Sequence, residues 1–157
     1  MGTGDAVPAV ELSSSECWGL LREAVVGRMA VIVDDHPEIF PVNHIVDRGS
    51  LVFRTAAGTK LSASVGHVVA FEVDGYDPVT GNAWSVVVKG RAVEVTRLYE
   101  VLEAVELPLF PWHSLPKPRF VRIDADSITG RRFRVQELSR TPGQAEPTDA
   151  ELHGEPE

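Results

Sequence analysis

The sequence predicts a mainly β fold, a six-stranded antiparallel barrel that is closed or nearly closed. Apolar runs rich in valine, isoleucine and phenylalanine recur at short intervals, and clusters of Asp, Gly and Pro separate them. Helical periodicity, by contrast, is clear only in one segment near the start. The strands are expected at residues 28–34, 38–46, 51–55, 67–74, 83–95 and 119–124, with 127–135 closing the domain.

A helix is expected ahead of the first strand, over residues 14–26. Ser13 and Glu16 stand at the spacing of a capping box, in which each side chain bonds a free backbone N–H group. Apolar residues then recur every three or four positions, and Gly27 is the expected end of the helix. Cys17 is the only cysteine, so it cannot form an intrachain disulfide, and we expect it to be a small buried residue of this helix.

Turns and irregular segments are predicted between the strands. Residues 34–37, 47–50 and 124–126 carry Asp, Gly or Pro and are expected to form turns. Gly90 would allow a bend in the long strand that contains it. A short helix is expected from Thr96 to about Ala104, followed by a Pro-rich loop over residues 107–118.

Composition indicates one domain between two tails. Residues 1–11 are expected to form a flexible lead, residues 12–138 the folded domain, and residues 139–157 a disordered acidic tail. The formal net charge of −8 disfavours nucleic-acid binding. No apolar stretch approaches the roughly 20 residues of a membrane helix, and no basic-then-apolar leader is evident. We therefore expect a cytoplasmic protein with no membrane partner.

One loop has the composition of a phosphate site. A strand ends at Arg54 and Thr55, small residues follow, and Thr59 and Lys60 open a helical turn. Backbone N–H groups at such a start attract anions, the threonine hydroxyls and the two cations would add donors, and Gly58 would let the backbone approach a ligand. A solvated strand-to-helix turn fits the same residues, and that alternative stays open.

Two further segments are candidates for contact with a flat ligand. Pro41 would free backbone groups in the segment Pro41-Val42-Asn43, and Asn43 offers both a donor and an acceptor to the edge of a ring. The alternative is an edge strand or β-bulge with no ligand. Trp84 could stack on a ring or simply belong to the core, whereas Trp112 lies among prolines, where a pocket or interface role is favoured.

Other kinds of site find little support. The five histidines show no metal-ligand spacing, so no metal is expected. Neither the Gly-x-Ser-x-Gly nor the Gly-x-Gly-x-x-Gly motif is present. His44 and His113 are the candidates for a proton relay, and no other acid or base stands out.

Taken in order, these segments resemble the FMN-binding split-barrel superfamily over about residues 12–135. The matching motifs are Gly-Arg-Met-Ala-Val, Pro-Val-Asn, Phe-Arg-Thr with Gly-Thr-Lys-Leu, Trp-Ser-Val-Val-Val-Lys-Gly-Arg-Ala and the closing Arg-Phe-Val-Arg-Ile. The chain looks like the small actinobacterial-type pyridoxamine 5′-phosphate oxidase-like proteins, close to the nitroimidazole-resistance-like branch. The resemblance implies a split β-barrel with Greek-key-like connections.

The resemblance also implies a cofactor site shared by two subunits. The FMN phosphate would be held at Thr55, Gly58, Thr59 and Lys60. The isoalloxazine would lie along Pro41, Val42 and Asn43. The family usually forms a homodimer in which partner aromatics complete each site, and Trp84 and Trp112 are the candidates here.

Two functions remain open at this point. The first is a flavin-dependent oxidoreductase acting on a small molecule, with FMN, or a deazaflavin as the alternative, supplying the chemistry. The second is a non-catalytic carrier or sensor of such a cofactor. The Arg-x-x-x-Leu-Lys signature of true pyridoxamine-phosphate oxidases is absent, and their C-terminal substrate residues have no match, so oxidation of vitamin B6 is not implied.

A homodimer is also expected from apolar excess alone. Strand 83–95 is apolar on both faces for much of its length, and loop 107–118 carries several large apolar residues. A two-fold dimer would bury both surfaces at once. The alternative is that the loop folds back over its own barrel.

Overall fold

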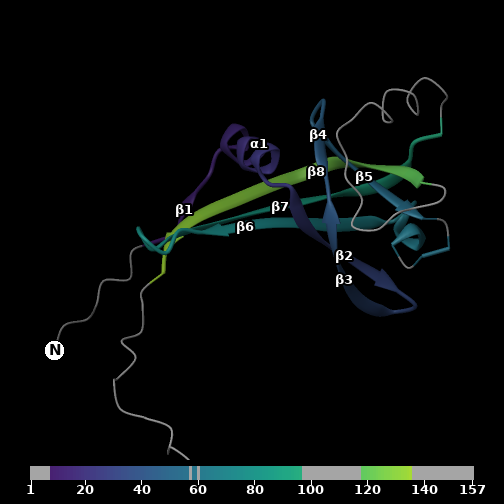
Figure 1. The fold of residues 1–157 in the computed structure, drawn as a ribbon, viewed down its shortest axis with the longest axis horizontal. Coiled ribbons are helices and arrows are strands. Elements are labelled where there is room, and N and C mark those ends of the chain that lie inside the picture. Colours follow the sequence, from purple (N-terminus) through teal and green to yellow (C-terminus); the bar gives the residue numbers. More distant parts are fainter. Residues whose placement is uncertain (1–7, 57, 60, 97–117, 136–157) are drawn as a thin grey trace, which may run out of the picture.

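The computed structural model describes residues 8–56, 58–59, 61–96 and 118–135, which form one curled antiparallel sheet and one α-helix (Figure 1). The elements in chain order are β1 (Val10–Glu11), α1 (Ser14–Glu23), β2 (Val26–Val33), β3 (His36–Asn43), β4 (Ile45–Asp47), β5 (Ser50–Ala56), the 3₁₀-helix η1 (Ser62–Ser64), β6 (Val68–Tyr76), β7 (Asn82–Glu94) and β8 (Pro118–Arg134). The sheet order is β3-β2-β6-β7-β8-β5-β4, with β1 also paired to β8. The predicted mainly β fold is confirmed.

The described residues contain eight strands, whereas the sequence predicts six. Strands β1 and β4 have only two and three residues, too few to show an alternating pattern. Strand β1 lies within the predicted flexible lead, and β4 continues predicted strand 38–46 beyond a break at His44. At the other end, predicted strands 119–124 and 127–135 are one continuous strand, β8. The predicted turn at 124–126 is therefore wrong.

A β-bulge explains the turn-like composition in the middle of β8. Two adjacent residues of β7, Lys89 and Gly90, pair with Ser127 and Ala125, so Asp126 is an extra residue on β8. Such a residue bends the strand locally. Gly90 is required at this point because a Cβ there would lie 1.9 Å from a carbonyl oxygen of β8. The bend predicted at Gly90 is thus present, and it is built by both strands.

Helix α1 begins as predicted and ends earlier. Ser13 is the N-cap and makes the full capping box with Glu16. The helix stops at Glu23, and Gly27 lies inside β2 instead of ending the helix, so that prediction is wrong. The β-branched pair before Gly27 favours extended backbone, and pairing of Gly27 with β3 holds it there.

Two predicted turns are confirmed as tight two-residue hairpins. Asp34 and Asp35 have φ values of 49° and 63° and connect β2 to β3. Arg48 and Gly49 have φ values of 50° and 75° and connect β4 to β5. Positive φ at both central residues matches the twist of the flanking strands, and Asp and Gly tolerate it best.

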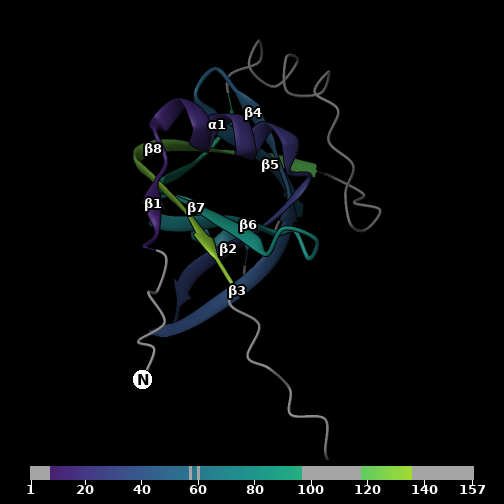
Figure 2. The ribbon, with the colours of Figure 1, turned by 90° about the vertical axis from the view of Figure 1, so that its left-hand side faces the viewer.

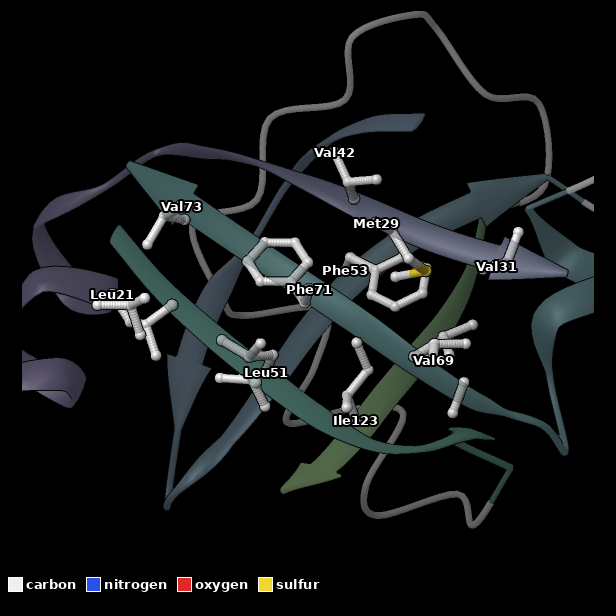
Figure 3. Packing of buried hydrophobic residues seen from close by; sticks show 14 of the residues in the cluster. Leu21, Met29, Val31, Val42, Leu51, Phe53, Val69, Phe71, Val73 and Ile123 are labelled. Carbon is white, nitrogen blue, oxygen red and sulfur yellow. The ribbon is translucent and has the colours of Figure 1, made fainter. Parts of the chain in front are cut away.

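One apolar cluster fills the inside of the curl. In β2, Met29 and Val31 point inward, while the residues between and beside them are exposed. Figure 3 shows Met29, Phe53 and Phe71 together inside the cluster. Cys17 is fully buried in the same cluster, as expected, and burial raises the pKa of its thiol.

Helix α1 covers part of the curled sheet, where it contacts β4, β7 and β8 (Figure 2). Strands β3 and β4 lie at the two ends of the hydrogen-bonded path, and the chain joins them directly through His44.

The helix at 96–104, the loop at 107–118 and the tail at 139–157 are predictions that lie outside the described residues. Across the described ranges, no helix has the length and apolar character of a membrane span.

Two glycine substitutions provide a matched test of this packing. Gly27→Ala should destabilise the fold by about 1–3 kcal/mol, because a Cβ would lie 2.2 Å from the buried ring of Phe71 and 2.9 Å from a backbone oxygen. Gly19→Ala on α1 should instead stabilise it by about 1 kcal/mol, because nothing lies within 4 Å of a Cβ there. Chemical denaturation of the three proteins measures both effects. Equal stability of the two variants would contradict the packing described.

Candidate functional site

Hydroxyl groups shape the loop between β5 and η1, where the sequence predicts a phosphate site. Thr59 Oγ1 donates to the carbonyl of Ala56 at 2.9 Å and accepts from the N–H of Ser62 at 3.1 Å. The two hydroxyl oxygens, Thr55 Oγ1 and Thr59 Oγ1, lie 3.0 Å apart, and Thr55 Oγ1 also donates to the carbonyl of Ala56 at 3.4 Å. The two predicted threonines therefore lie together and hold the loop in one shape.

Gly58 leaves one side of this loop open. Its φ of +78° is in the left-handed region, and a Cβ on it would meet nothing within 4 Å. Gly58 and Thr59 are exposed, so an anion can reach the loop backbone from solvent. At the base of the loop, the guanidinium of Arg54 lies 5.6 Å from the centre of the Phe120 ring, within reach of a cation–π interaction. Lys60 lies outside the described residues.

The predicted ring-binding strand is the edge strand β3. Pro41 is exposed and pairs with Arg28, Val42 is buried and pairs with Gly27, and Asn43 is half-buried. The pairing of β3 with β2 runs without a register shift, so Pro41 marks an edge strand and not a bulge. Pro41 and Asn43 lie on the outward face of the sheet, where Pro41 is accessible to solvent and Asn43 partly so.

Trp84 lies on the inward face of β7. It shares that face with Val86 and Val88, which are fully buried. Its indole ring lies over Gly75 of β6, where a Cβ would come within 2.5 Å of it. Trp84 is half-buried and packs at one end of the core.

The structure separates Trp84 from the phosphate loop within one chain. Thr55 pairs with Arg119 near the start of β8, beside the Glu94 end of β7. From Trp84 to Glu94 is ten residues, about 33 Å at the rise of a strand. Trp84 could therefore join the loop in one site only if a second copy of the chain supplied it. Trp112, the other predicted aromatic, is not among the described residues.

A group of three charged side chains lies next to the ring-binding strand. Arg28 bonds Glu72 at 3.2 Å and Asp74 at 3.4 Å across β2 and β6. Burial, with Asp74 nearby, raises the pKa of Glu72, while Arg28 lowers it. Because Arg28 also pairs with Pro41 in the sheet, this cluster borders the ring-binding strand on the outward face.

The same outward face carries exposed aliphatic side chains. Ile32, Ile39 and Val68 are each 60–67% exposed. Between them, Ala30 of β2 pairs with Ile39 on one side and with Ala70 on the other. Ala30, Ile32, Ile39 and Val68 therefore form an exposed apolar surface on the ring-binding strand and its two neighbours. Exposed apolar patches are common where proteins contact other molecules.

His44, the proton-relay candidate of this region, is sealed in the core. Its Nε2 donates to the carbonyl of Leu21 at 2.8 Å, which leaves Nδ1 as the unprotonated nitrogen. The ring meets Phe71 edge-on at 4.8 Å between centroids, and Nδ1 is buried with no partner among the described residues. Burial lowers the pKa of His44, and the bond to Leu21 acts in the opposite direction. The hydrogen bond to Leu21 connects the end of β3 to α1. A ligand on the outward face cannot reach the buried ring.

No group of three metal-ligating side chains occurs in the part of the chain that the structure describes. The functional features that sequence reasoning missed are the outward aliphatic face and the Arg28 cluster. Period-2 alternation in the predicted strand at 28–34, with Met29 and Val31 inward, places Arg28 and Ile32 on the outward face, but it does not show which strands lie beside them.

The chain belongs to the pyridoxamine 5′-phosphate oxidase family, whose model matches residues 13–132. It is 37% identical over 139 residues to the uncharacterized protein Rv0080 of Mycobacterium tuberculosis, covering 85% of this chain and 90% of that protein. The structure of an FAD binding protein from Mycobacterium smegmatis is 40% identical, with a TM-score of 0.74, and the match covers 81% of this chain and all of that one.

A more distant neighbour shares the fold alone. It is a protein from Bacteroides thetaiotaomicron assigned to 5-nitroimidazole antibiotic resistance, 13% identical with a TM-score of 0.65. The match covers 80% of this chain and 88% of that chain. The family and the fold implied by the sequence motifs are thus confirmed.

The burial of His44 predicts a loss of stability in mild acid. Its lowered folded-state pKa means that the unfolded chain binds the proton more readily, so its contribution is full above about pH 6.5 and is lost as pH falls through the folded pKa. Urea unfolding between pH 7.5 and 5 should show this loss in the native protein and a flatter profile in His44→Gln, whose amide can still donate to Leu21. Parallel profiles would contradict the burial of a neutral His44.

Proposed function

We propose that this protein binds a flavin and acts as a flavin-dependent oxidoreductase on a small molecule. The observation that carries the proposal is the loop between β5 and η1, which two threonines hold open on its Gly58 side. Gly58, Thr59 and Lys60 would hold the terminal phosphate, with Thr55 supporting the loop. The ring would lie along Pro41, Val42 and Asn43 of the edge strand.

The bound flavin would supply the electron transfer, and the chain would orient it and select the substrate. This division fits the position of His44, which is buried away from the outward face and cannot pass protons to a ligand there. The same observation also favours the second candidate function, a carrier or sensor that holds the cofactor without turnover. Reduction of the bound flavin by a nicotinamide donor, followed by reoxidation by an acceptor, distinguishes the two.

We infer FMN as the flavin because the loop between β5 and η1 offers a site for one phosphate. The similar protein from Mycobacterium smegmatis is an FAD binding protein, which makes FAD the alternative. Absorbance of the purified protein near 450 nm, with mass spectrometry of the released ligand, separates FMN, FAD and a deazaflavin. A colourless protein that takes up none of the three at micromolar concentration would contradict the proposal.

We also propose that the protein is a homodimer in which the outward aliphatic face lies at the interface. Ile32, Ile39 and Val68 would then be covered, and a two-fold axis would bring the same face of each copy together. Trp84 of one copy would reach the cofactor held by the loop of the other, which accounts for their separation of about 33 Å along β7 within one chain.

Lys60→Ala tests the phosphate contact. Loss of one charge-assisted contact, which contributes about 1.5–3 kcal/mol, should weaken flavin affinity by about one to two orders of magnitude. Arg22→Ala, which removes an exposed cation from α1, is the control for net charge and should bind normally. Fluorescence titration with FMN measures both variants. Unchanged affinity in Lys60→Ala would place the phosphate elsewhere.

Ile32→Glu tests the interface. A charge on the outward aliphatic face should convert a dimer of twice 17.1 kDa into a monomer, because an unpaired carboxylate would be buried on association. Val79→Glu, at a position 92% exposed in the turn after β6, should leave the dimer intact. Light scattering gives the masses, and circular dichroism checks the fold of each variant. A native protein that is monomeric with and without flavin would overturn the dimer.

A further inference from the structure

A hollow of about 460 Å³ lies at the hairpin end of β6 and β7, where the last residues of β8 also run. Six side chains that define its chemistry are Asp74, Tyr76, Trp84, Ser85, Phe133 and Val135. None of them belongs to the phosphate loop or the ring-binding strand. This volume is sufficient for an aromatic molecule of two or three fused rings. It lies at the small end of the range of volumes found for ligand pockets.

Two aromatic side chains of the hollow, Tyr76 and Phe133, lie on the same outward face of the sheet as Asp74. Trp84 borders the hollow from the inward face, where its ring lies over Gly75. Tyr76 is half exposed and Phe133 is 36% exposed, so a ligand in the hollow can reach both rings from solvent. Aromatic rings in this arrangement offer flat apolar surfaces on which a planar molecule can stack.

Two polar groups lie together on one side of the hollow. Asp74 of β6 and Ser85 of β7 are cross-strand partners, so their side chains lie next to each other. The Asp74 carboxylate is held by Arg28 at 3.4 Å, and Arg28 also bonds Glu72. The three charged side chains therefore carry one negative charge in excess, and the carboxylate that borders the hollow is fixed in place on its other side.

We propose that this hollow binds a planar aromatic compound of two or three fused rings with an N–H donor or cationic nitrogen that bonds Asp74. The site rests on the proposed function only for the chemistry that would follow binding. In the proposed dimer it adjoins the ring held by the other copy, so the compound would be the substrate. A neutral ring without an N–H donor would lose the contact with Asp74 and bind more weakly.

The position of the Arg28 cluster supports this assignment. Arg28 pairs in the sheet with Pro41 of the ring-binding strand and with Glu72 of β6. Two strand spacings, about 10 Å, therefore separate Pro41 from Glu72, whose neighbour Asp74 opens into the hollow. One charged cluster thus connects the two regions, and it fixes the carboxylate that the ligand would contact.

The test uses 9-aminoacridine, a planar tricyclic cation that is fluorescent, and acridine, the same ring system without the amino group. Fluorescence anisotropy with the full chain should show one 9-aminoacridine bound per chain and at least about tenfold weaker competition by acridine. Asp74→Asn and Phe133→Ala should each weaken 9-aminoacridine by about tenfold. Asp126→Asn, the same charge change at an exposed bulge residue on β8, should have no effect.

Flavin affinity is measured on the same variants, which separates this proposal from the proposed function. Probe binding that depends on Asp74, in a protein that takes up no flavin, would support the hollow and overturn the flavoprotein. Equal probe affinity of Asp74→Asn and Asp126→Asn would overturn the hollow. Competitive displacement of the probe by FMN would also overturn it, because the hollow would then be the cofactor's own pocket.

Discussion

The pairing of β7 with β8 is the interaction on which the rest of the structure depends. These are the two longest strands, and every other strand of the sheet extends from one of them: β6, β2 and β3 on one side, β5, β4 and β1 on the other. The bulge opposite Gly90 bends the pair at its middle. Because of that bend the sheet curls around one cluster of apolar side chains instead of remaining flat and exposed.

The same pair explains the separation of functional features. One end of β7 lies beside the phosphate loop and the other end carries the hollow with Trp84 and Phe133. The outward face of β2, β3 and β6 carries Ile32, Ile39 and Val68, which are exposed in the part of the chain that the structure describes. In a dimer, the phosphate loop of one copy could lie beside the Trp84 end of the other copy's β7. The exposed apolar face of β2, β3 and β6 would provide a surface for such an assembly.

Sequence reasoning succeeded where local chemistry decides the structure. The capping box of Ser13 and Glu16 and the tight turns at 34–35 and 48–49 depend on neighbouring residues only. It failed where distant strands decide. Gly27 has the appearance of a helix end until its partner on β3 is known. Residues 124–126 have the composition of a turn until their pairing with β7 around Gly90 is known.

The candidate site follows the same division. The Thr55–Thr59 loop is contiguous, so its motif was visible in the sequence. The Arg28 cluster and the hollow join residues of strands far apart in the chain, and no spacing in the sequence reveals them. For His44, the residue type alone suggests proton transfer. Its burial against Leu21 and Phe71, which the sequence does not show, gives it a structural role instead.

The central claim is that two copies share each flavin site, one supplying the phosphate loop and the other the aromatic wall. Mixing two defective variants, Lys60→Ala and Trp84→Ala, tests it most directly. After exchange of subunits, about half of the dimers contain one copy of each variant, and each of these has one site with both native residues. The account predicts that tight flavin binding, weakened in each variant alone, returns at about a quarter of all sites. A mixture that binds flavin no better than the separate variants would contradict it.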